Sequence, residues 1–442
     1  MPLNFNSKSP SLKIKFIKKY LLFILLTILS FNSKAQIMYY PPLSSTATWD
    51  TISPATLGWC VNRIDSLYRF LNAQNTKAFI VLKDGKIVLE KYFDTFTQDS
   101  VWYWASAGKT ITSFLVGKAQ ENGYLSIADT TSKYLGNGWT TCTLPQEKNI
   151  SIRNQLTMTT GLDDGVPDNH CTTNTCLKYL AAAGTRWAYH NTPYTLLEKV
   201  LENATGQSIN NFTQNTLKQK TGITGAWYTN GYDNVFYSKP RSMARFGLLY
   251  QNNCIWKTDT LLRDTAYIKA SINTSQNYNN GYGYLWWLNG KSSYMVPGSQ
   301  LIIPGNVAAQ APADMFAGIG KNGQIISIAK STGLVFIRMG EAPGDFSEVP
   351  FVLCNKIWEN LNYVRCSSNI YTFTGNGYWS IAANWYNNTI PPAILATGAQ
   401  IIIDPIATGE CILNSTQTIK NGSSIKVIDG KKLRILGNLL MQ

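Results

Sequence analysis

An α+β fold of the α/β-sandwich type is predicted for the main part of the chain, with a small all-β module after it. Two observations predict this fold. Helical and strand-like hydrophobic periods alternate from Pro54 to about Arg365, and the strand signals gather at both ends of that region, around a helical middle. An early hairpin and several late strands can therefore meet in one antiparallel sheet, with flanking helices and a helical subdomain beside it.

The first elements of this region are a helix and a hairpin. Apolar residues recur with a helical period between Leu57 and Leu71. The apolar runs 78–82 and 87–89 follow, and the Asp84-Gly85 dipeptide between them is typical of a hairpin turn. We expect one helix followed by two antiparallel strands.

Strand signals return after the helical middle, at residues 282–288, 315–319, 325–329 and 334–338. Residues 346–361 have the pattern of a closing helix. The tail is richer in Asn, Gly, Thr and Ile, with short alternating runs at 401–403, 424–427 and 433–435. It predicts a small β-rich module over residues 367–442, whose role the sequence does not indicate.

Residues 1–35 have the pattern of a secretory signal peptide. Lysines lead into an apolar run over residues 20–31, and Ser33-Lys34-Ala35 then forms a small-x-small cleavage site. The run is shorter than the roughly 20 residues that a membrane-spanning helix needs. We expect cleavage after Ala35, a mature domain over 36–366, and an exported protein (periplasmic, cell-surface or secreted) with no stable membrane span.

The charge balance argues against a nucleic-acid partner. The formal net charge is +14, but six lysines and no acidic residue lie within residues 1–35. The remaining residues therefore carry +8, with no dense basic run that could follow a phosphate backbone.

An exported chain can keep disulfides, and its eight cysteines are compatible with full pairing. Cys171 with Cys176 and Cys354 with Cys366 are candidate pairs, whereas the other four have no evident mates. With two histidines and no CxxC pair, we expect no metal site, and nothing indicates an organic cofactor.

Ser106-Ala107-Gly108-Lys109 is the strongest candidate for a nucleophile and its base. It opens an amphipathic stretch, and positions i and i+3 of a helix share a face, so the lysine amine can reach the serine hydroxyl. A serine needs such a base to become a good nucleophile. The alternative is a helix cap with an exposed lysine. The S-x-x-K pattern recurs at 327–330 and 423–426, in strand-like runs where the two side chains point to opposite faces.

Further motifs follow in a consistent order: Tyr189-His190-Asn191, residues 242–249, residues 282–287 and Lys321-Asn322-Gly323-Gln324. With them, residues 54–362 resemble the serine β-lactamase and penicillin-binding-protein superfamily, in its class C, D-aminopeptidase and carboxylesterase branch. The resemblance implies a transpeptidase-like antiparallel sheet and an acyl-enzyme mechanism that needs no cofactor.

The resemblance also implies roles for single residues. Ser106 is acylated, Lys109 and Tyr189 share the proton relay, and Asn191 hydrogen-bonds Lys109 and the substrate amide. Which of Lys109 and Tyr189 is the formal base stays open. The backbone N–H groups of Ser106 and Gln324 form the oxyanion hole.

Lys321, Gly323 and Gln324 are expected to bind substrate. Lys321-Asn322-Gly323 replaces the family's usual K-[TS]-G triplet, which keeps the cation but loses a hydroxyl that helps to hold a substrate carboxylate. This weakens a β-lactamase interpretation and favours small esters or amides. If the segment is extended, the His190 side chain is expected to project away from those of Tyr189 and Asn191, and His170 is expected to lie at the rim of the pocket.

These observations predict an exported serine hydrolase, carboxylesterase- or amidase-like, that acts on a small-molecule ester, amide or peptide substrate. A D-Ala-D-Ala carboxypeptidase or a β-lactamase is the alternative within enzymes. A non-catalytic cell-wall peptide-binding protein is the alternative of another class, and in either case the C-terminal module can contact the cell wall or a glycan.

Overall fold

The structure, a computed structural model, describes residues 1, 38–44, 47–344, 349–366, 370–395 and 399–442. The predicted signal peptide lies outside the described residues, apart from Met1. The chain divides into the units Met1–Tyr39 and Tyr40–Gln442, and the second unit is described below. Among the described residues, no helix has the length and apolar character needed to cross a bilayer.

One six-stranded antiparallel sheet organises the main domain, in the order β2-β1-β13-β12-β11-β8. The early hairpin therefore pairs directly with the last strand, as predicted. Its turn has positive φ at Asp84 and Gly85, which is typical of a tight hairpin. The strands are β1 (Thr76–Lys83), β2 (Lys86–Tyr92), β8 (Trp287–Leu288), β11 (Phe316–Gly320), β12 (Gln324–Ala329) and β13 (Leu334–Gly340).

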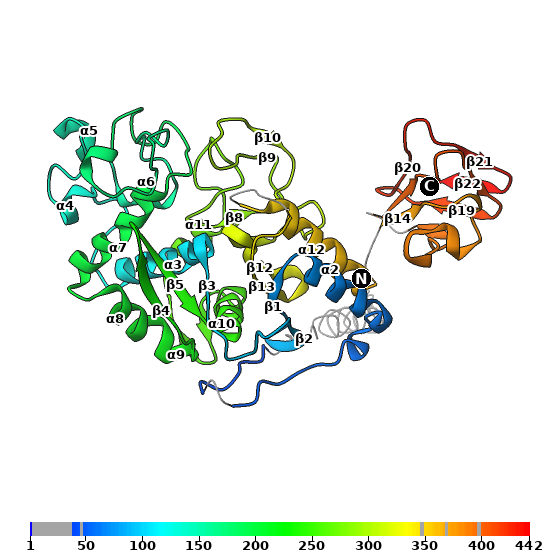
Figure 1. Cartoon of the computed structure of the whole chain (residues 1–442), viewed down its shortest axis with the longest axis horizontal. Helices are drawn as coiled ribbons and strands as arrows, with labels where there is room; N and C mark the ends of the chain where they lie inside the picture. The colour runs from blue at the N-terminus through cyan, green and yellow to red at the C-terminus, as the bar shows by residue number, and fades with distance from the viewer. Residues whose placement is uncertain (2–37, 45–46, 345–348, 367–369, 396–398) are drawn as a thin grey trace. The chain divides into compact units, whose positions relative to one another are not determined.

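Helices cover both faces of this sheet (Figure 1). On one face is α10 (Pro240–Gln251), where a Cβ on Gly247 would lie 2.5 Å from Val335. The next residue of β13, Phe336, points to the other face and makes an edge-to-face contact with Trp358, with ring centroids 5.5 Å apart. Trp358 belongs to α12 (Phe351–Val364), which packs beside α2 (Ile64–Ala73).

The middle of the chain forms the predicted helical subdomain and three small two- or three-stranded sheets. Its helices are α3 (Lys109–Glu121), α4 (Ser132–Leu135), α5 (Leu144–Lys148), α6 (Ile152–Leu156), α7 (Asn191–Thr205), α8 (Ile209–Thr213), α9 (Gln219–Thr221) and α11 (Thr265–Ser271). Its strands are β3 (Trp102–Tyr103), β4 (Ala226–Asn230), β5 (Asp233–Ser238), β6 (Ile255–Trp256), β7 (Asp259–Thr260), β9 (Ser293–Tyr294) and β10 (Ile303–Pro304).

Three predicted elements differ in extent from those observed. The first helix, expected from Leu57, begins only at Ile64, after two 3-10 turns at Ala55–Leu57 and Val61–Arg63. The run 282–288 is a strand only at Trp287–Leu288, because Leu285 has φ 63° and interrupts the extended conformation. The closing helix begins at Phe351 rather than at 346, and residues 346–348 lie outside the described part of the chain.

The C-terminal module, residues 370–442, is all β as predicted, but its strands pair in parallel. The chain forms a coil, and each turn of the coil adds one strand to each of three sheets. The strand orders are β14-β17-β20, β15-β18-β21 and β16-β19-β22. Phe373, Trp379 and Trp385 are buried inside this coil. The strands are β14 (Ile370–Phe373), β15 (Gly377–Tyr378), β16 (Ile394–Leu395), β17 (Gln400–Ile403), β18 (Cys411–Leu413), β19 (Thr416–Ile419), β20 (Ser424–Val427), β21 (Leu433–Ile435) and β22 (Asn438–Met441).

Two disulfides are present among the described residues. Cys171 pairs with Cys176, as predicted. Cys366 pairs with Cys60 and not with Cys354, so that prediction is wrong. Cys354 lies on α12 about 18 Å of helix away from Cys366, which is too far to bridge. Cys354 is buried as a free thiol, and Cys142, Cys254 and Cys411 are also unpaired in disulfides.

Candidate active site

Ser106 and Lys109 meet at the start of α3, as their spacing predicts. A 3-10 turn, Ala105–Gly108, carries the serine into the helix, whose first residue is Lys109. Lys109 is buried, and its Nζ donates a hydrogen bond to Ser106 Oγ at 2.8 Å. Ala105, just before the serine, has φ 45°, a left-handed conformation that is costly for alanine and concentrates at functional sites.

The other two S-x-x-K runs do not form such a pair. Ser327 lies in β12, and its hydroxyl accepts a hydrogen bond from the Trp358 indole. Lys330 instead donates to Asn253. Ser423 donates to the carbonyl of Lys420, next to β20. These contacts are structural, so the helical setting distinguishes Ser106 and Lys109.

Asn191 holds the amine of Lys109 from the opposite side. It is the first residue of α7, and its Oδ1 accepts a hydrogen bond from Lys109 Nζ at 2.9 Å. The lysine amine therefore lies between the Ser106 hydroxyl and the Asn191 amide. Asn191 Nδ2 faces the other way, 3.2 Å from His170 Nε2 and 3.4 Å from Asn169 Oδ1.

Two tyrosine rings surround this amine. Lys109 Nζ lies 5.1 Å from the centre of the Tyr189 ring and 4.2 Å from that of Tyr194. Tyr189 is buried and stacks on Trp287 with an interplanar angle of 20°. The structure thus brings Tyr189 to Lys109, but Tyr189 is not among the described residues that line the cavity. Tyr194 does line it, and its position three residues after Asn191 was the sequence signal that could have found it.

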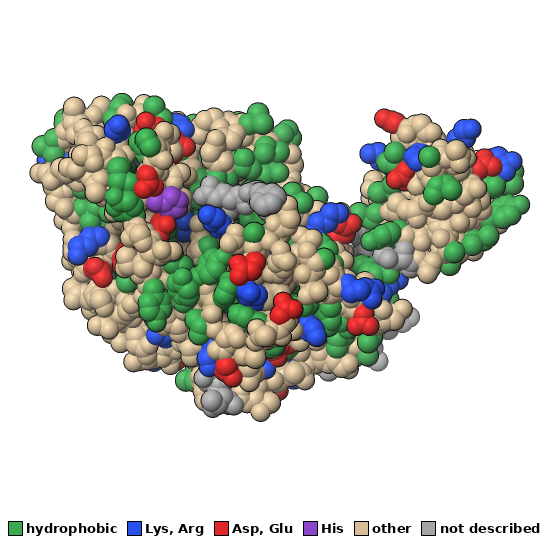
Figure 2. All heavy atoms as spheres, in the orientation of Figure 1, with side chains coloured by type: hydrophobic (Ala, Val, Ile, Leu, Met, Phe, Trp, Pro, Cys, Tyr) green, Lys and Arg blue, Asp and Glu red, His purple; other side chains and the backbone are tan. Residues whose placement is uncertain are grey.

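A cavity of about 850 Å³ opens onto Ser106 and Lys109. Most of the residues that line it have polar side chains, among them five asparagines and three tyrosines, although polar and apolar atoms contribute nearly equal parts of the wall. Figure 2 shows the exposed histidine of this region with acidic side chains beside it. The remaining lining residues are Tyr103, Ala105, Asn169, His170, Asn191, Tyr194, Asn230, Asp233, Asn234, Val235, Tyr237, Lys321, Asn322 and Ala342.

Lys321 and Asn322 reach this cavity, but Gly323 and Gln324 do not line it. They belong to the turn between β11 and β12, where Gln324 pairs with Gly320. The Gln324 amide is fully buried, donates to the Gly340 carbonyl at 2.7 Å and accepts from its N–H at 3.1 Å. These contacts show that Gln324 holds the turn in place through its side chain, and substrate binding by Gly323 and Gln324 stays a prediction.

Gly320 is the residue of this hairpin that lies against the nucleophile. A Cβ on Gly320 would be 2.8 Å from the backbone nitrogens of both Ser106 and Ala107. No side chain fits there, so the end of β11 runs directly past the Ser106 amide. Lys321 is the next residue along the chain.

Arg338 on β13 anchors the same turn from inside the protein. Its Nη1 donates to the carbonyls of Asn322 at 2.7 Å and Gly323 at 2.8 Å. The side chain is fully buried, and burial lowers the pKa of Arg338 to about 9, so it stays charged at neutral pH. A lone arginine within the apolar run 334–339 was the sequence signal for this role.

The two histidines differ in their surroundings. His170 lines the cavity, as its predicted rim position implies. His190 is buried, and neither of its ring nitrogens has a hydrogen-bond partner among the described residues. Burial lowers the pKa of His190 to about 4, so it is neutral at pH 7. Among the residues that the structure describes, no cluster of three His, Cys, Asp or Glu side chains could hold a metal ion.

Comparison with known proteins agrees with this geometry. Residues 71–345 match the family model Beta-lactamase. PbpX of Bacillus subtilis (strain 168), provisionally named a penicillin-binding protein, is 22% identical over 172 residues, which are 36% of this chain and 42% of PbpX. The chain therefore matches less than half of that relative.

Two solved structures share the fold. A protein from Bacteroides dorei DSM 17855, provisionally described as a β-lactamase, superposes with a TM-score of 0.55 and 18% identity, over 70% of this chain and 99% of the other. A penicillin-binding protein homologue from Caulobacter crescentus gives a TM-score of 0.53 and 11% identity, over 69% and 98%. At these identities the likeness establishes the fold alone.

Proposed function

The chain belongs to the Beta-lactamase family, and from that premise we propose that it is a serine hydrolase that cleaves ester or amide bonds of small polar substrates through an acyl-enzyme on Ser106. The observation that carries the proposal is the placement of Lys109 Nζ, 2.8 Å from Ser106 Oγ and 2.9 Å from Asn191 Oδ1. Burial of a lysine disfavours its charged form, and a neutral amine at this distance can accept the serine proton.

The chemistry follows in two steps. The Ser106 hydroxyl gives its proton to Lys109 or to the phenolate of Tyr189 while Oγ attacks the substrate carbonyl carbon. The tetrahedral intermediate then collapses, and the leaving group departs with that proton. Water then gives a proton to the same base as it attacks the acyl-enzyme, and that proton passes to Ser106 Oγ as the acid is released.

We assign the oxyanion hole to the backbone N–H groups of Ser106 and Lys321. Gly320 packs against the Ser106 amide, and Lys321 follows it directly. Gln324, the donor that the family resemblance implied, lies across the hairpin in the β12 ladder. One preorganised donor of this kind contributes about 3 to 4 kcal/mol to transition-state stabilisation.

The cavity wall favours a polar substrate. Asparagine amides can both donate and accept hydrogen bonds, and here five of them line the cavity that opens onto Ser106. Asn322, which stands where the family has a hydroxyl, donates to the Tyr103 hydroxyl at 2.7 Å. This arrangement supports small esters or amides above β-lactams. Lys321 in the wall supports a D-Ala-D-Ala carboxypeptidase as the second candidate, since its cation could bind a substrate carboxylate.

Export and a cell-wall or glycan contact through the C-terminal module remain predictions. Periplasmic or extracellular recovery of a protein that begins after Ala35 would test the first. Pull-down of the full chain by insoluble cell-wall material, compared with a chain ending at Cys366, would test the second.

Labelling with a fluorophosphonate probe tests the proposed activity. We expect a covalent adduct in the wild type that Ser106→Ala and Lys109→Ala abolish. The matched controls are Ser423→Ala and Lys426→Ala, which change the S-x-x-K run of the tail and should label normally. Equal labelling of wild type and Ser106→Ala would refute the assignment and favour a binding protein. Parallel turnover of a chromogenic ester, a D-Ala-D-Ala peptide and a chromogenic cephalosporin then ranks the substrate classes, with the ester expected first.

A further inference from the structure

We propose that His170 and Asp233 are positioning residues of this site, which hold the side-chain amide of Asn191 in the one orientation that lets its oxygen accept from Lys109. The inference rests on the proposed function, because it concerns the same nucleophile. It adds two residues that neither the S-x-x-K nor the Y-x-N motif contains.

The contacts form a continuous chain from a carboxylate to the nucleophile. Asp233 Oδ2 lies 2.7 Å from His170 Nδ1 in an ion-pair contact that does not have hydrogen-bond geometry, and its negative charge favours the tautomer with the proton on Nδ1. That tautomer leaves a lone pair on Nε2, which lies 3.2 Å from Asn191 Nδ2 and can accept its hydrogen. Asn191 Oδ1 is then the atom that faces Lys109 Nζ.

The opposite orientation of the Asn191 amide is unfavourable at both ends. Its NH₂ group would face the donor hydrogens of Lys109, and its oxygen would face the lone pair of His170 Nε2. The imidazole, together with Asn169 Oδ1 at 3.4 Å from Asn191 Nδ2, therefore selects one of two orientations that are alike in shape and differ only in hydrogen bonding.

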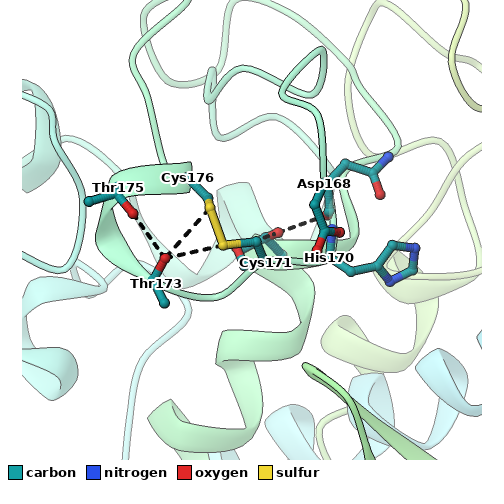
Figure 3. The surroundings of a disulfide bond; sticks show 8 residues. Asp168, His170, Cys171, Thr173, Thr175 and Cys176 are labelled. Carbon is teal, nitrogen blue, oxygen red and sulfur yellow. Dashed lines mark hydrogen bonds between the residues drawn. A yellow bond between two sulfur atoms is a disulfide. The ribbon is translucent and has the colours of Figure 1, made fainter.

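The scaffold around His170 is built to hold it at this place. The hydroxyl of Thr192 on α7 donates to the carbonyls of Asn169 at 2.7 Å and Cys171 at 3.1 Å, on either side of the histidine. The Cys171–Cys176 disulfide closes the loop directly after it, and Figure 3 shows the imidazole directed away from that disulfide. Asp168 Oδ1 accepts the backbone N–H of His170 at 2.9 Å.

Asp233 is held from the same helix. It is the first residue of β5, and Thr195 Oγ1 of α7 lies 3.5 Å from its Oδ1. Thr195 comes one helical turn after Asn191, so a single helix sets the positions of Asn191 and of the groups that orient it.

Exposure separates a positioning role from a purely structural one. The His170 and Asp233 side chains are 43% and 33% exposed, and a pair this exposed contributes little to folding. Both side chains line the cavity with Asn191. Their loss should therefore affect the reaction much more than the stability.

Protonation of His170 provides a second signature. The imidazolium carries hydrogens on both nitrogens, so Nε2 can no longer accept from Asn191 Nδ2. The charged and titratable groups around it are Asp233 on β5, Asp168 on its own loop, Lys109 on α3, Lys321 after β11 and His190 before α7. Asp233 favours the imidazolium, so Asp233→Asn should move the loss of activity to lower pH.

The test uses the full chain and two readouts, hydrolysis of p-nitrophenyl acetate and the rate of fluorophosphonate labelling. We expect His170→Ala to lower the labelling rate and kcat by about 10- to 100-fold, with KM changed by less than about 3-fold. His170→Gln, which offers both a donor and an acceptor, should stay within about 5-fold of wild type and lose the acid titration. Asp259→Asn, in a surface pair with Lys220, is the matched control for Asp233→Asn and should behave as wild type.

Thermal melting distinguishes unfolding of the protein from misorientation of the Asn191 amide, and we expect all variants to melt within about 2 °C of wild type. Should His170→Ala unfold, Asp233→Asn tests the same inference, because Asp233 is the residue that contacts His170. Wild-type labelling rates in His170→Ala, or an equal loss in His170→Gln and His170→Ala, would overturn the inference and leave the proposed function standing. Absence of any Ser106-dependent labelling in the wild type would overturn both.

Discussion

Replacing Arg338 with methionine removes the buried cation that holds the turn beside the nucleophile. Besides its two bonds to the turn, the guanidinium donates to Thr76 Oγ1 at 3.0 Å and to the carbonyls of Gln74 at 2.5 Å and Glu341 at 3.2 Å. Five charge-assisted bonds at about 1.5 to 3 kcal/mol each give a gross contribution near 10 kcal/mol. Desolvation of the guanidinium offsets several kcal/mol of this.

We therefore expect a net loss of about 3 to 5 kcal/mol in the free energy of unfolding, because Arg338→Met removes the guanidinium donor from one buried and three part-buried carbonyls. For a domain of this size about 1 to 2 °C of Tm corresponds to each kcal/mol, so Tm should fall by roughly 5 °C. Ester hydrolysis should fall by about 10-fold or more even well below Tm, since the displaced turn carries Lys321 and Asn322.

Arg241→Met is the matched control. Arg241 makes a bidentate ion pair with Glu90, at 2.7 and 2.8 Å, and neither residue lines the cavity. This variant should lose stability and keep its ester activity. Calorimetry and steady-state kinetics on both proteins decide the matter: an Arg338→Met enzyme with wild-type Tm and kcat/KM would refute the reasoning.

Four further outcomes are expected. Tyr189→Phe should lower ester hydrolysis by about 100-fold, as expected for a general acid/base. A loss under 3-fold would show that the hydroxyl is not required and that Tyr189 contributes only the ring that covers Lys109. Burial raises the pKa of Glu198 to about 7, so the protein should lose stability as pH rises from about 4.5 to 7. In urea titrations at pH 8, Glu198→Gln should be more stable than wild type by about 1 to 2 kcal/mol, after allowance for partial exposure of Glu198. Burial lowers the pKa of His190, so its contribution is lost as pH falls from about 6.5 toward 4, and His190→Phe should flatten the melting temperature over that range. The double variant Cys171→Ser/Cys176→Ser should slow fluorophosphonate labelling, because the disulfide closes the loop next to His170, and should change Tm little, because that loop is short. Unchanged labelling would show that the loop keeps its shape without the disulfide.

Patterns within a few residues determined much of this protein. The i, i+3 spacing of Ser106 and Lys109, the turn at Asp84-Gly85 and the apolar runs of the sheet depend on local geometry, so the sequence alone predicted them. The order of motifs also led to Asn191 and Lys321, which the structure brings to the same cavity as Ser106.

Tertiary structure alone decided the partners that are far apart along the chain. His170 contacts Asn191 from a loop, and Asp233 contacts His170 from a hairpin. Cys60 pairs with Cys366, 306 residues away in the sequence. The strand register pairs Gln324 with Gly320, and the Gln324 side-chain amide donates to the Gly340 carbonyl, neither of which the sequence indicated. A sequence specifies which residues can hydrogen-bond, but only packing sets the distance and direction on which each such bond depends.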